Sequence, residues 1–252
     1  MKQYLSTIRP SRPLHYLTYI DVLVLAILFF GEPIYSSQLV WLQTLSGKVA
    51  VSDVLEFSAS DNWSALIGQG RQLLLALLYL FLRRYPFKQL NIRWNWSILP
   101  WTVFIFLTAG IVCDLSFSLL SLLPGVPDHY NYLSFLPYYD WSFSTFFSSF
   151  VTIDLSTLIY SLFNGFYEEL FFLGLLLSTE PSKRGLILLF STIIRTLFHT
   201  YQGLVPALVI GVSFGLFYYY LYTKRQDNLL PYFLAHALAD MVGISFLTLF
   251  AG

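Results

Sequence analysis

Long apolar runs divide the chain into seven stretches that can form membrane helices. A helix crosses a bilayer with about 17–25 residues. The stretches cover residues 17–30, 64–82, 98–123, 152–177, 185–200, 204–222 and 229–250. We expect Glu32-Pro33 to end the first, and polar residues 35–63 and 124–141 to form outer loops. The pattern predicts an all-α fold, a polytopic membrane helix bundle of about seven transmembrane helices.

Composition excludes most other classes of protein. Charged residues are 11% and hydrophobic residues 56% of the 252 residues, whereas an ordinary soluble domain has about 25% charged residues. The net charge of zero argues against a partner that is a nucleic acid. The single cysteine, Cys113, excludes a disulfide framework within the chain and a thiolate metal cluster. The lipid bilayer is therefore the expected surrounding, and the expected location is a cell membrane, crossed several times.

The basic residues predict an orientation. Eleven of the 14 Lys and Arg residues fall in the N-terminal tail and in alternate loops: Lys2, Arg9, Arg12, Arg83, Arg84, Lys88, Arg93, Lys183, Arg184, Lys224 and Arg225. Positive residues stay in the cytoplasm, so the N-terminus is predicted to be cytoplasmic. We expect two regions: residues 1–150, with three spans and the outer loops, and residues 151–252, a four-span core.

The four-span core places ionisable residues inside the membrane, where each costs about 2.5–3.5 kcal/mol on insertion scales. They occur as pairs in three spans: Glu168 with Glu169, Arg195 with His199, and His236 with Asp240. His236 and Asp240 are four residues apart and share a helix face. At about 1.5 Å per residue, Glu168, His199, His236 and Asp240 can lie in one layer near the middle of the membrane.

These residue types together suggest hydrolysis. A carboxylate in a low-dielectric pocket is a good general base for water. Two imidazoles can hold that water, stabilise an oxyanion or bind a divalent metal, and Asp240 can fix the tautomer of His236 or act as a further ligand. Such residues also serve as structural hydrogen-bonding partners between helices, or as proton relays in transporters.

Other polar residues have a structural interpretation. Asp21 and Asp114 are embedded in predicted spans, and pairing with Arg71 is the simplest expectation for them. Asp154 lies near the outer end of the fourth span and is expected to cap that helix. Four tyrosines at the end of the sixth span are expected to form an interfacial aromatic belt: Tyr218, Tyr219, Tyr220 and Tyr222.

Three motifs in the second half of the chain resemble those of the type II CAAX prenyl endopeptidases, also called the CAAX protease and bacteriocin-processing (Abi) family. The first is a Glu-Glu pair followed by an apolar stretch and glycine, here residues 168–174. The second places a histidine near a helix end, here His199-Thr200-Tyr201-Gln202-Gly203, and the third is His236 followed four residues later by Asp240. The resemblance covers roughly residues 150–245.

Two positions depart from the family pattern. The family usually has Arg four residues after its second Glu, where this chain has Leu173, and Phe four residues before the second-motif His, where it has Arg195. If the fourth and fifth spans are adjacent, Arg195 puts a guanidinium in the place of the missing one, beside Glu169. Arg195 is thus a predicted supporting residue. The departure also leaves room for a member without catalysis.

The resemblance implies an intramembrane endopeptidase that cuts a peptide or membrane-protein substrate. By the family pattern, Glu168 would activate water, His199 and His236 would complete the site, Asp240 would take the third-motif position and Glu169 would support them. The mechanism would be glutamate-type or metal-assisted, and Glu168, His199 and His236 could hold a divalent metal such as zinc. The implied location is a bacterial plasma membrane. The alternatives are a catalytically silent relative in bacteriocin self-immunity or scaffolding, and a proton-coupled small-solute transporter.

Overall fold

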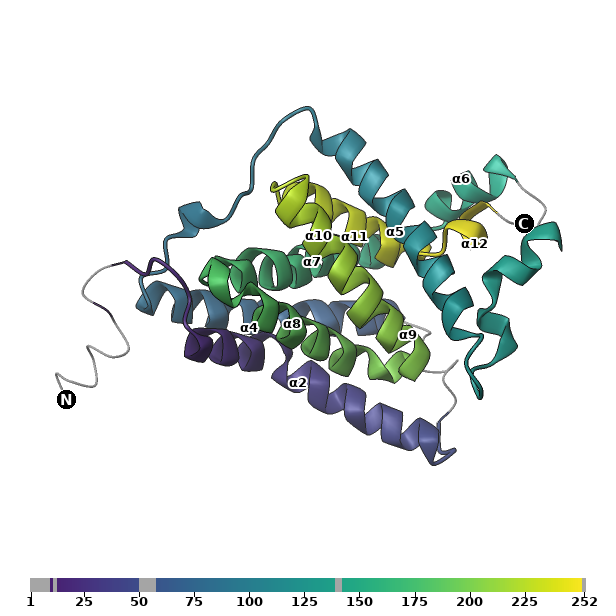
Figure 1. Cartoon of the computed structure of the whole chain (residues 1–252), viewed down its shortest axis with the longest axis horizontal. Coiled ribbons are helices and arrows are strands. Elements are labelled where there is room, and N and C mark those ends of the chain that lie inside the picture. The colour runs from purple at the N-terminus through teal and green to yellow at the C-terminus, as the bar shows by residue number, and fades with distance from the viewer. Residues whose placement is uncertain (1–9, 11–12, 50–57, 139–141, 251–252) are drawn as a thin grey trace.

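The computed structural model describes residues 10, 13–49, 58–138 and 142–250, and within them the chain is helical and forms no strand (Figure 1). The α-helices are α2 (Tyr19–Leu45), α4 (Ala59–Leu82), α5 (Ile98–Leu120), α6 (Phe143–Val151), α7 (Leu155–Glu169), α8 (Arg184–His199), α9 (Leu204–Leu208), α10 (Gly215–Lys224), α11 (Leu230–Val242) and α12 (Phe246–Phe250). Two π-helical segments, η4 (Leu170–Leu175) and η8 (Val209–Phe214), continue α7 and α9. Short 3₁₀ turns are η1 (Phe87–Gln89), η2 (Asp128–Tyr130), η3 (Tyr132–Tyr138), η5 (Leu176–Ser178), η6 (Pro181–Lys183) and η7 (Thr200–Gln202).

Four helical stretches among the described residues are long and apolar enough to cross a membrane: Tyr19–Leu45, Ala59–Leu82, Ile98–Leu120 and Leu204–Lys224. The all-helical membrane class is therefore confirmed, whereas the number seven and the cytoplasmic N-terminus remain predictions. The other predicted spans correspond to α7 continued by η4 and η5, to α8, and to α11.

Helix α2 does not end at Glu32-Pro33, and that prediction is wrong. The helix continues to Leu45 with Pro33 inside it. Proline lacks the N–H that would bond to the carbonyl four residues earlier, which is that of Phe29. The hydroxyl of Tyr167 in α7 donates to this carbonyl at 2.5 Å. A tertiary hydrogen bond thus replaces the missing helical one, and half of the predicted outer loop 35–63 is helix.

The predicted seventh span is interrupted. Helix α11 ends at Val242, and Gly243 follows with a φ of +84°, a conformation that glycine adopts without strain. The chain then turns into α12, whose Leu247 backbone N–H donates to Asp114 in α5 at 2.9 Å. Asp114 therefore anchors α12 and does not pair with Arg71.

The loops that carry basic residues meet at one end of the bundle. The backbone N–H of Leu17 donates to Ser178, the hydroxyl of Tyr85 bonds to Ser178, and Arg93 pairs with Asp227. This grouping fits the predicted sidedness. Its first members, Lys2, Arg9 and Arg12, lie outside the described residues.

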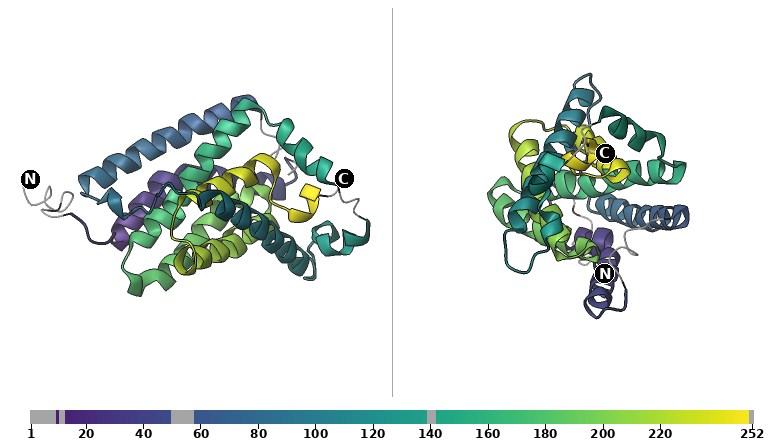
Figure 2. Two further views of the ribbon diagram at one scale, coloured as in Figure 1. Left: turned by 90° about the horizontal axis from the view of Figure 1, so that it is seen from above. Right: turned by 90° about the vertical axis from the view of Figure 1, so that its right-hand side faces the viewer.

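The packing places α7 at the centre. It contacts α11 on one side and α4 on the other, while α2 packs against α8 (Figures 1 and 2). Behind it, buried rings from α2, α7, η4 and α8 contact one another: Phe29, Phe30, Tyr167, Phe171, Phe172 and Phe198. This aromatic cluster fixes the positions of the helices that carry the polar residues described next.

Candidate active site

Helix α7 brings its polar face directly against α11. It begins at the predicted cap, Asp154, which accepts bonds from the backbone of Ser156 and Thr157. Hydrogen bonds from these two residues lower the pKa of Asp154 to about 2. Farther along, a Cβ atom on Gly165 would overlap the carbonyl oxygen of Phe233 in α11. Only glycine therefore permits this approach, which brings the Glu-Glu pair to the histidine of α11.

Glu169 is the centre of a buried ionic cluster from three helices. Its carboxylate accepts two hydrogen bonds from the Arg195 guanidinium, at 3.0 and 3.1 Å, and one from His236 Nδ1 at 2.8 Å. Glu169 is fully buried and Arg195 is 3% exposed. The guanidinium also lies 3.9 Å from the ring centroid of Phe172. The structure thus puts the Arg195 guanidinium beside Glu169. This is the position expected if Arg195 replaces the arginine that the family has in place of Leu173, four residues after Glu169.

Glu168 faces the other way and keeps one oxygen free of partners. Oε1 accepts a hydrogen bond from Asn164 Nδ2 at 3.2 Å. Oε2 is buried and has no hydrogen-bond partner among the described residues. It lies 3.9 Å from His236 Nε2. A buried carboxylate oxygen without a protein partner is costly, and it is available to accept a hydrogen bond from water or substrate.

Asn164 connects the two acidic side chains of the site. The same Nδ2 that donates to Glu168 also donates to Asp240 at 2.8 Å, and Oδ1 accepts from Gln69 of α4 at 2.6 Å. The orientation of the Asn164 amide follows from its partners. Ionised carboxylates only accept hydrogen bonds, so the amide nitrogen must face Glu168 and Asp240. Asp240 also lies 3.6 Å from His236 Nε2.

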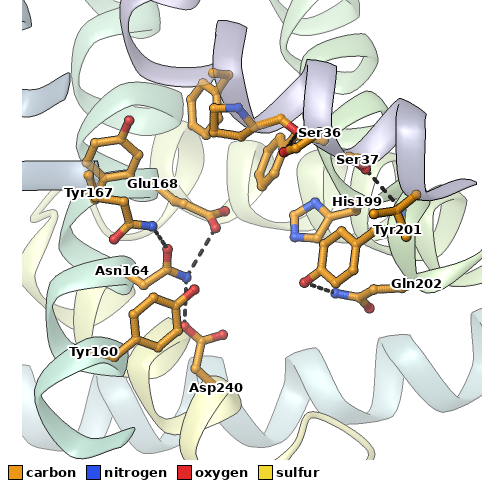
Figure 3. Close-up of a pocket in the computed structure, with 15 residues that line it drawn as sticks. Ser36, Ser37, Tyr160, Asn164, Tyr167, Glu168, His199, Tyr201, Gln202 and Asp240 are labelled. Carbon is orange, nitrogen blue, oxygen red and sulfur yellow. Dashed lines mark hydrogen bonds between the residues drawn. The ribbon is translucent and has the colours of Figure 1, made fainter. Parts of the chain in front are cut away.

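His199 stands across a cavity from Glu168 (Figure 3). Its Nδ1 lies 2.8 Å from the carbonyl oxygen of Arg195, one turn earlier in α8. A carbonyl only accepts, so Nδ1 carries the hydrogen and Nε2 is left for the cavity. Tyr201, also in the cavity wall, stacks on the imidazole at a centroid distance of 6.4 Å. Hydrogen bonding and stacking together fix the orientation of the ring.

The cavity has a volume of about 410 Å³. Its polar lining comes from α2, α4, α7, α8, η7 and α11: Ser36, Ser37, Gln69, Tyr160, Asn164, Glu168, His199, Tyr201, Gln202 and Asp240. A second cavity of about 200 Å³ adjoins it, because His199, Gln202 and Asp240 line both, and His236 and Arg195 line the second. Space for water therefore lies between Glu168 and His199.

Five of the six predicted site residues line these two cavities, and the sixth, Glu169, is buried behind them against Arg195 and His236. Their predicted roles stay predictions. The sequence interpretation had given no role to Asn164, Tyr160 or Gln69, and uncharged polar residues carry little signal in a sequence. It also placed Tyr218 in an interfacial belt, whereas Tyr218 is 4% exposed and lines the second cavity.

The other embedded charges pair away from the site. Asp21 accepts hydrogen bonds from Arg83 and Tyr79, at 2.6 and 2.7 Å, and Arg71 pairs with Glu32 at 2.5 Å. The expected pairing of Arg71 with Asp21 is therefore wrong. These ion pairs join α2 to α4 and stabilise the bundle without touching the Glu-Glu pair.

A divalent metal does not fit the arrangement as it stands. The donor types are suitable, because Glu168 Oε2, His199 Nε2 and His236 Nε2 are not taken up by close protein partners. Yet within the described part of the chain no three His, Cys, Asp or Glu side chains converge closely enough to hold an ion. The zinc site of Glu168, His199 and His236 remains a prediction.

Comparison with known proteins supports the resemblance seen in the motifs. Residues 150–242 match the sequence model of the family described as type II CAAX prenyl endopeptidase Rce1-like. The matched segment runs from the start of α7 to the end of α11 and holds every predicted site residue. The comparisons with curated proteins and with solved structures found no match. A multi-pass membrane location fits both the matched protease family and the four helical stretches that are long and apolar enough to cross a membrane. The motif-bearing region of this chain, residues 150–242, thus matches the type II CAAX prenyl endopeptidase Rce1-like family.

Proposed function

We propose that the protein is an intramembrane endopeptidase that hydrolyses a peptide bond with a water molecule activated by Glu168. The observation that carries the proposal is the unpartnered Oε2 of Glu168, buried beside a cavity with His199 on the opposite side. An acceptor in that position needs a donor, and water is the donor that hydrolysis requires.

The steps follow from the geometry of the described residues. A water molecule donates one hydrogen bond to Glu168 Oε2 and another to an imidazole Nε2, which directs an oxygen lone pair at the substrate carbonyl. As the oxygen attacks the carbonyl carbon, Glu168 takes the proton. The tetrahedral intermediate collapses when the C–N bond breaks, and the leaving nitrogen takes the proton from Glu168. Atoms and charges balance, and Glu168 returns to its starting form.

The remaining residues position this pair. The Glu169 carboxylate accepts a hydrogen bond from His236 Nδ1, which leaves Nε2 directed toward Glu168 and Asp240. Arg195 neutralises Glu169 with two hydrogen bonds, so the acid next to Glu168 stays fixed. Asn164 holds Glu168 Oε1 and thereby selects Oε2 as the reacting oxygen. We propose a membrane-associated protein or peptide as the substrate.

Glu168→Gln tests the proposal, because the amide keeps the size of the side chain and cannot accept the proton. Full-length wild-type and variant proteins are expressed in cells that lack the chain, and new N-termini of membrane proteins are compared by mass spectrometry. We expect termini that depend on the wild type and fall about 10²- to 10⁴-fold in Glu168→Gln. Glu180→Gln, at an exposed loop position, is the matched control and should keep them.

The other outcomes identify the alternatives. If the wild type produces no new termini while both it and Glu168→Gln protect cells against a bacteriocin, the chain acts as an immunity protein. If uptake of a small solute follows the pH gradient and stops in Glu168→Gln, the buried acid serves transport. Either result contradicts the endopeptidase.

A further inference from the structure

The candidate active site is rich in hydrogen-bond acceptors and poor in free donors. Glu168 Oε2 and the Asp240 carboxylate only accept when ionised. Peptide hydrolysis creates an oxyanion on the substrate, and stabilising it requires a donor at that point. The proposed reaction therefore needs a side chain in the cavity wall whose N–H or O–H is not already bonded to the protein.

The imidazoles do not supply a free donor. His199 Nδ1 donates to the Arg195 carbonyl, so the neutral ring presents a lone pair at Nε2. His236 Nδ1 donates to Glu169 in the same way. If His236 is charged, its Nε2–H is directed at two carboxylates, with Asp240 at 3.6 Å and Glu168 at 3.9 Å. In either state the N–H groups of His236 face protein acids.

The side-chain amides in the cavity wall are engaged as well. Asn164 Nδ2 already donates to both Glu168 and Asp240. Gln202 Nε2 donates to the hydroxyl oxygen of Tyr201 at 2.8 Å. Turning any of these groups toward the substrate would break a buried hydrogen bond, which is costly in a site of low dielectric.

Tyr160 is different. It lies four residues before Asn164 and eight before Glu168, so the three side chains share one face of α7. It lines the cavity, and its ring lies beside Asn164 and Asp240 with the hydroxyl at the cavity (Figure 3). Within the described residues, its hydroxyl makes no hydrogen bond to a protein group. We infer that Tyr160 is a further catalytic residue, whose hydroxyl donates a hydrogen bond to the oxyanion of the tetrahedral intermediate.

This inference rests on the proposed endopeptidase function and adds the hydrogen-bond donor that stabilises its oxyanion. As water adds to the carbonyl carbon, the C=O π electrons move to oxygen, and the Tyr160 O–H shortens its hydrogen bond to that oxygen. The proton stays on Tyr160, because Glu168 carries the proton that the water loses. When the C–N bond breaks, the carbonyl reforms and the hydrogen bond weakens again.

The test is Tyr160→Phe, which removes one oxygen atom and leaves the ring in place. The full-length protein in lipid nanodiscs is assayed with an internally quenched peptide spanning the cleavage site with the strongest wild-type signal. We expect kcat to fall about 10²-fold, the typical cost of losing one oxyanion donor, with KM changed less than about twofold. Tyr220→Phe is the matched control, since it removes the hydroxyl of an exposed tyrosine in α10 that lines neither cavity, and it should keep kcat.

A binding measurement separates catalysis from structure. A phosphinate analogue of the same peptide places a tetrahedral, negatively charged centre at the scissile position. Tyr160→Phe should weaken its binding by the same factor as kcat and leave the affinity for the cleaved product unchanged. Unchanged kcat and phosphinate affinity in Tyr160→Phe, or an equal loss in Tyr220→Phe, would overturn the inference while the endopeptidase stands. An inactive wild type overturns the proposed function itself.

Discussion

The two regions of the chain use membrane helices differently. In the first region, α2, α4 and α5 are uninterrupted helices of 27, 24 and 23 residues, and all three are long and apolar enough to cross a membrane. In the second region, α7 runs into a π-helical segment, α8 has 16 residues and α11 has 13. Hydropathy alone thus identifies α2, α4 and α5 more readily than α7, α8 and α11, the helices that carry the candidate site.

The difference follows from what each region has to bury. Polar groups in a low-dielectric interior need partners, and the second region supplies them with two buried acids, an arginine and two imidazoles around one pair of cavities. In the first region, the buried Asp21 and Asp114 each accept hydrogen bonds from protein donors away from the cavities, and Arg71–Glu32 is an exposed ion pair at the surface. A short or broken helix lowers the hydropathy of the span, and it also lets side chains from several helices meet.

The largest expected effect comes from breaking the buried ion pair Arg195–Glu169, with the exposed pair Arg71–Glu32 as the comparison. Arg195→Phe leaves Glu169 buried without its charge partner and should destabilise the fold by about 3–5 kcal/mol, with loss of proteolysis. Arg71→Met removes an exposed partner and should cost about 0–1 kcal/mol. Unfolding of both variants in mixed micelles, followed by denaturant titration, measures the contrast.

The same pair has a rescue variant. Leu173→Arg combined with Arg195→Phe returns a guanidinium to the neighbourhood of Glu169, one turn away on its own helix. Activity in this double variant, absent from Arg195→Phe, would support the exchange of positions. If both are equally inactive, Arg195 has a role that a guanidinium at 173 cannot fill.

A smaller effect compares two glycines. Gly165→Ala pushes α7 away from the α11 backbone and should cost about 1–3 kcal/mol, as overpacking does, and it should reduce cleavage by separating Glu168 from His236. Gly70→Ala in α4 meets no atom within 4 Å and should be neutral or stabilise by up to about 1 kcal/mol. Melting temperatures and cleavage rates test both, and equal behaviour of the two variants would show that the α7–α11 contact is not critical.

An effect of similar size concerns the proline in α2. Tyr167→Phe leaves the buried carbonyl of Phe29 without its donor and should cost about 1–3 kcal/mol. Pro33→Ala supplies a backbone N–H for that carbonyl. The double variant should therefore lose less than the sum of the single variants, and strict additivity in a double-mutant cycle would contradict the compensation.

The sequence was sufficient for the class of fold and for the composition of the site, because ionisable residues in apolar spans are conspicuous. It was insufficient where one residue depends on a distant one. Pro33 looked like a helix end because its compensating donor, Tyr167, is more than a hundred residues away in the chain. Asp114 looked unpaired because its partner is a backbone N–H created by the turn at Gly243.

Uncharged polar groups were the other gap. Asn164, Tyr160 and Gln69 are common residue types in membrane helices, and nothing in their spacing separates them from helix–helix contacts. Only the coordinates show that Asn164 donates to two carboxylates and that Tyr160 lines the cavity. The sequence therefore predicted the ionisable residues of the candidate site and not its uncharged polar residues.

The cavity wall has a wider consequence. The residues to which we assign the hydrolysis belong to the matched segment 150–242, whereas Phe30, Pro33, Ser36, Ser37 and Val40 come from α2 and Gln69 from α4. In the proposed endopeptidase, the reacting residues and one part of the cavity wall are thus encoded on separate stretches of polypeptide. Exchanges in α2 would then change that part of the wall and leave the reacting residues as they are.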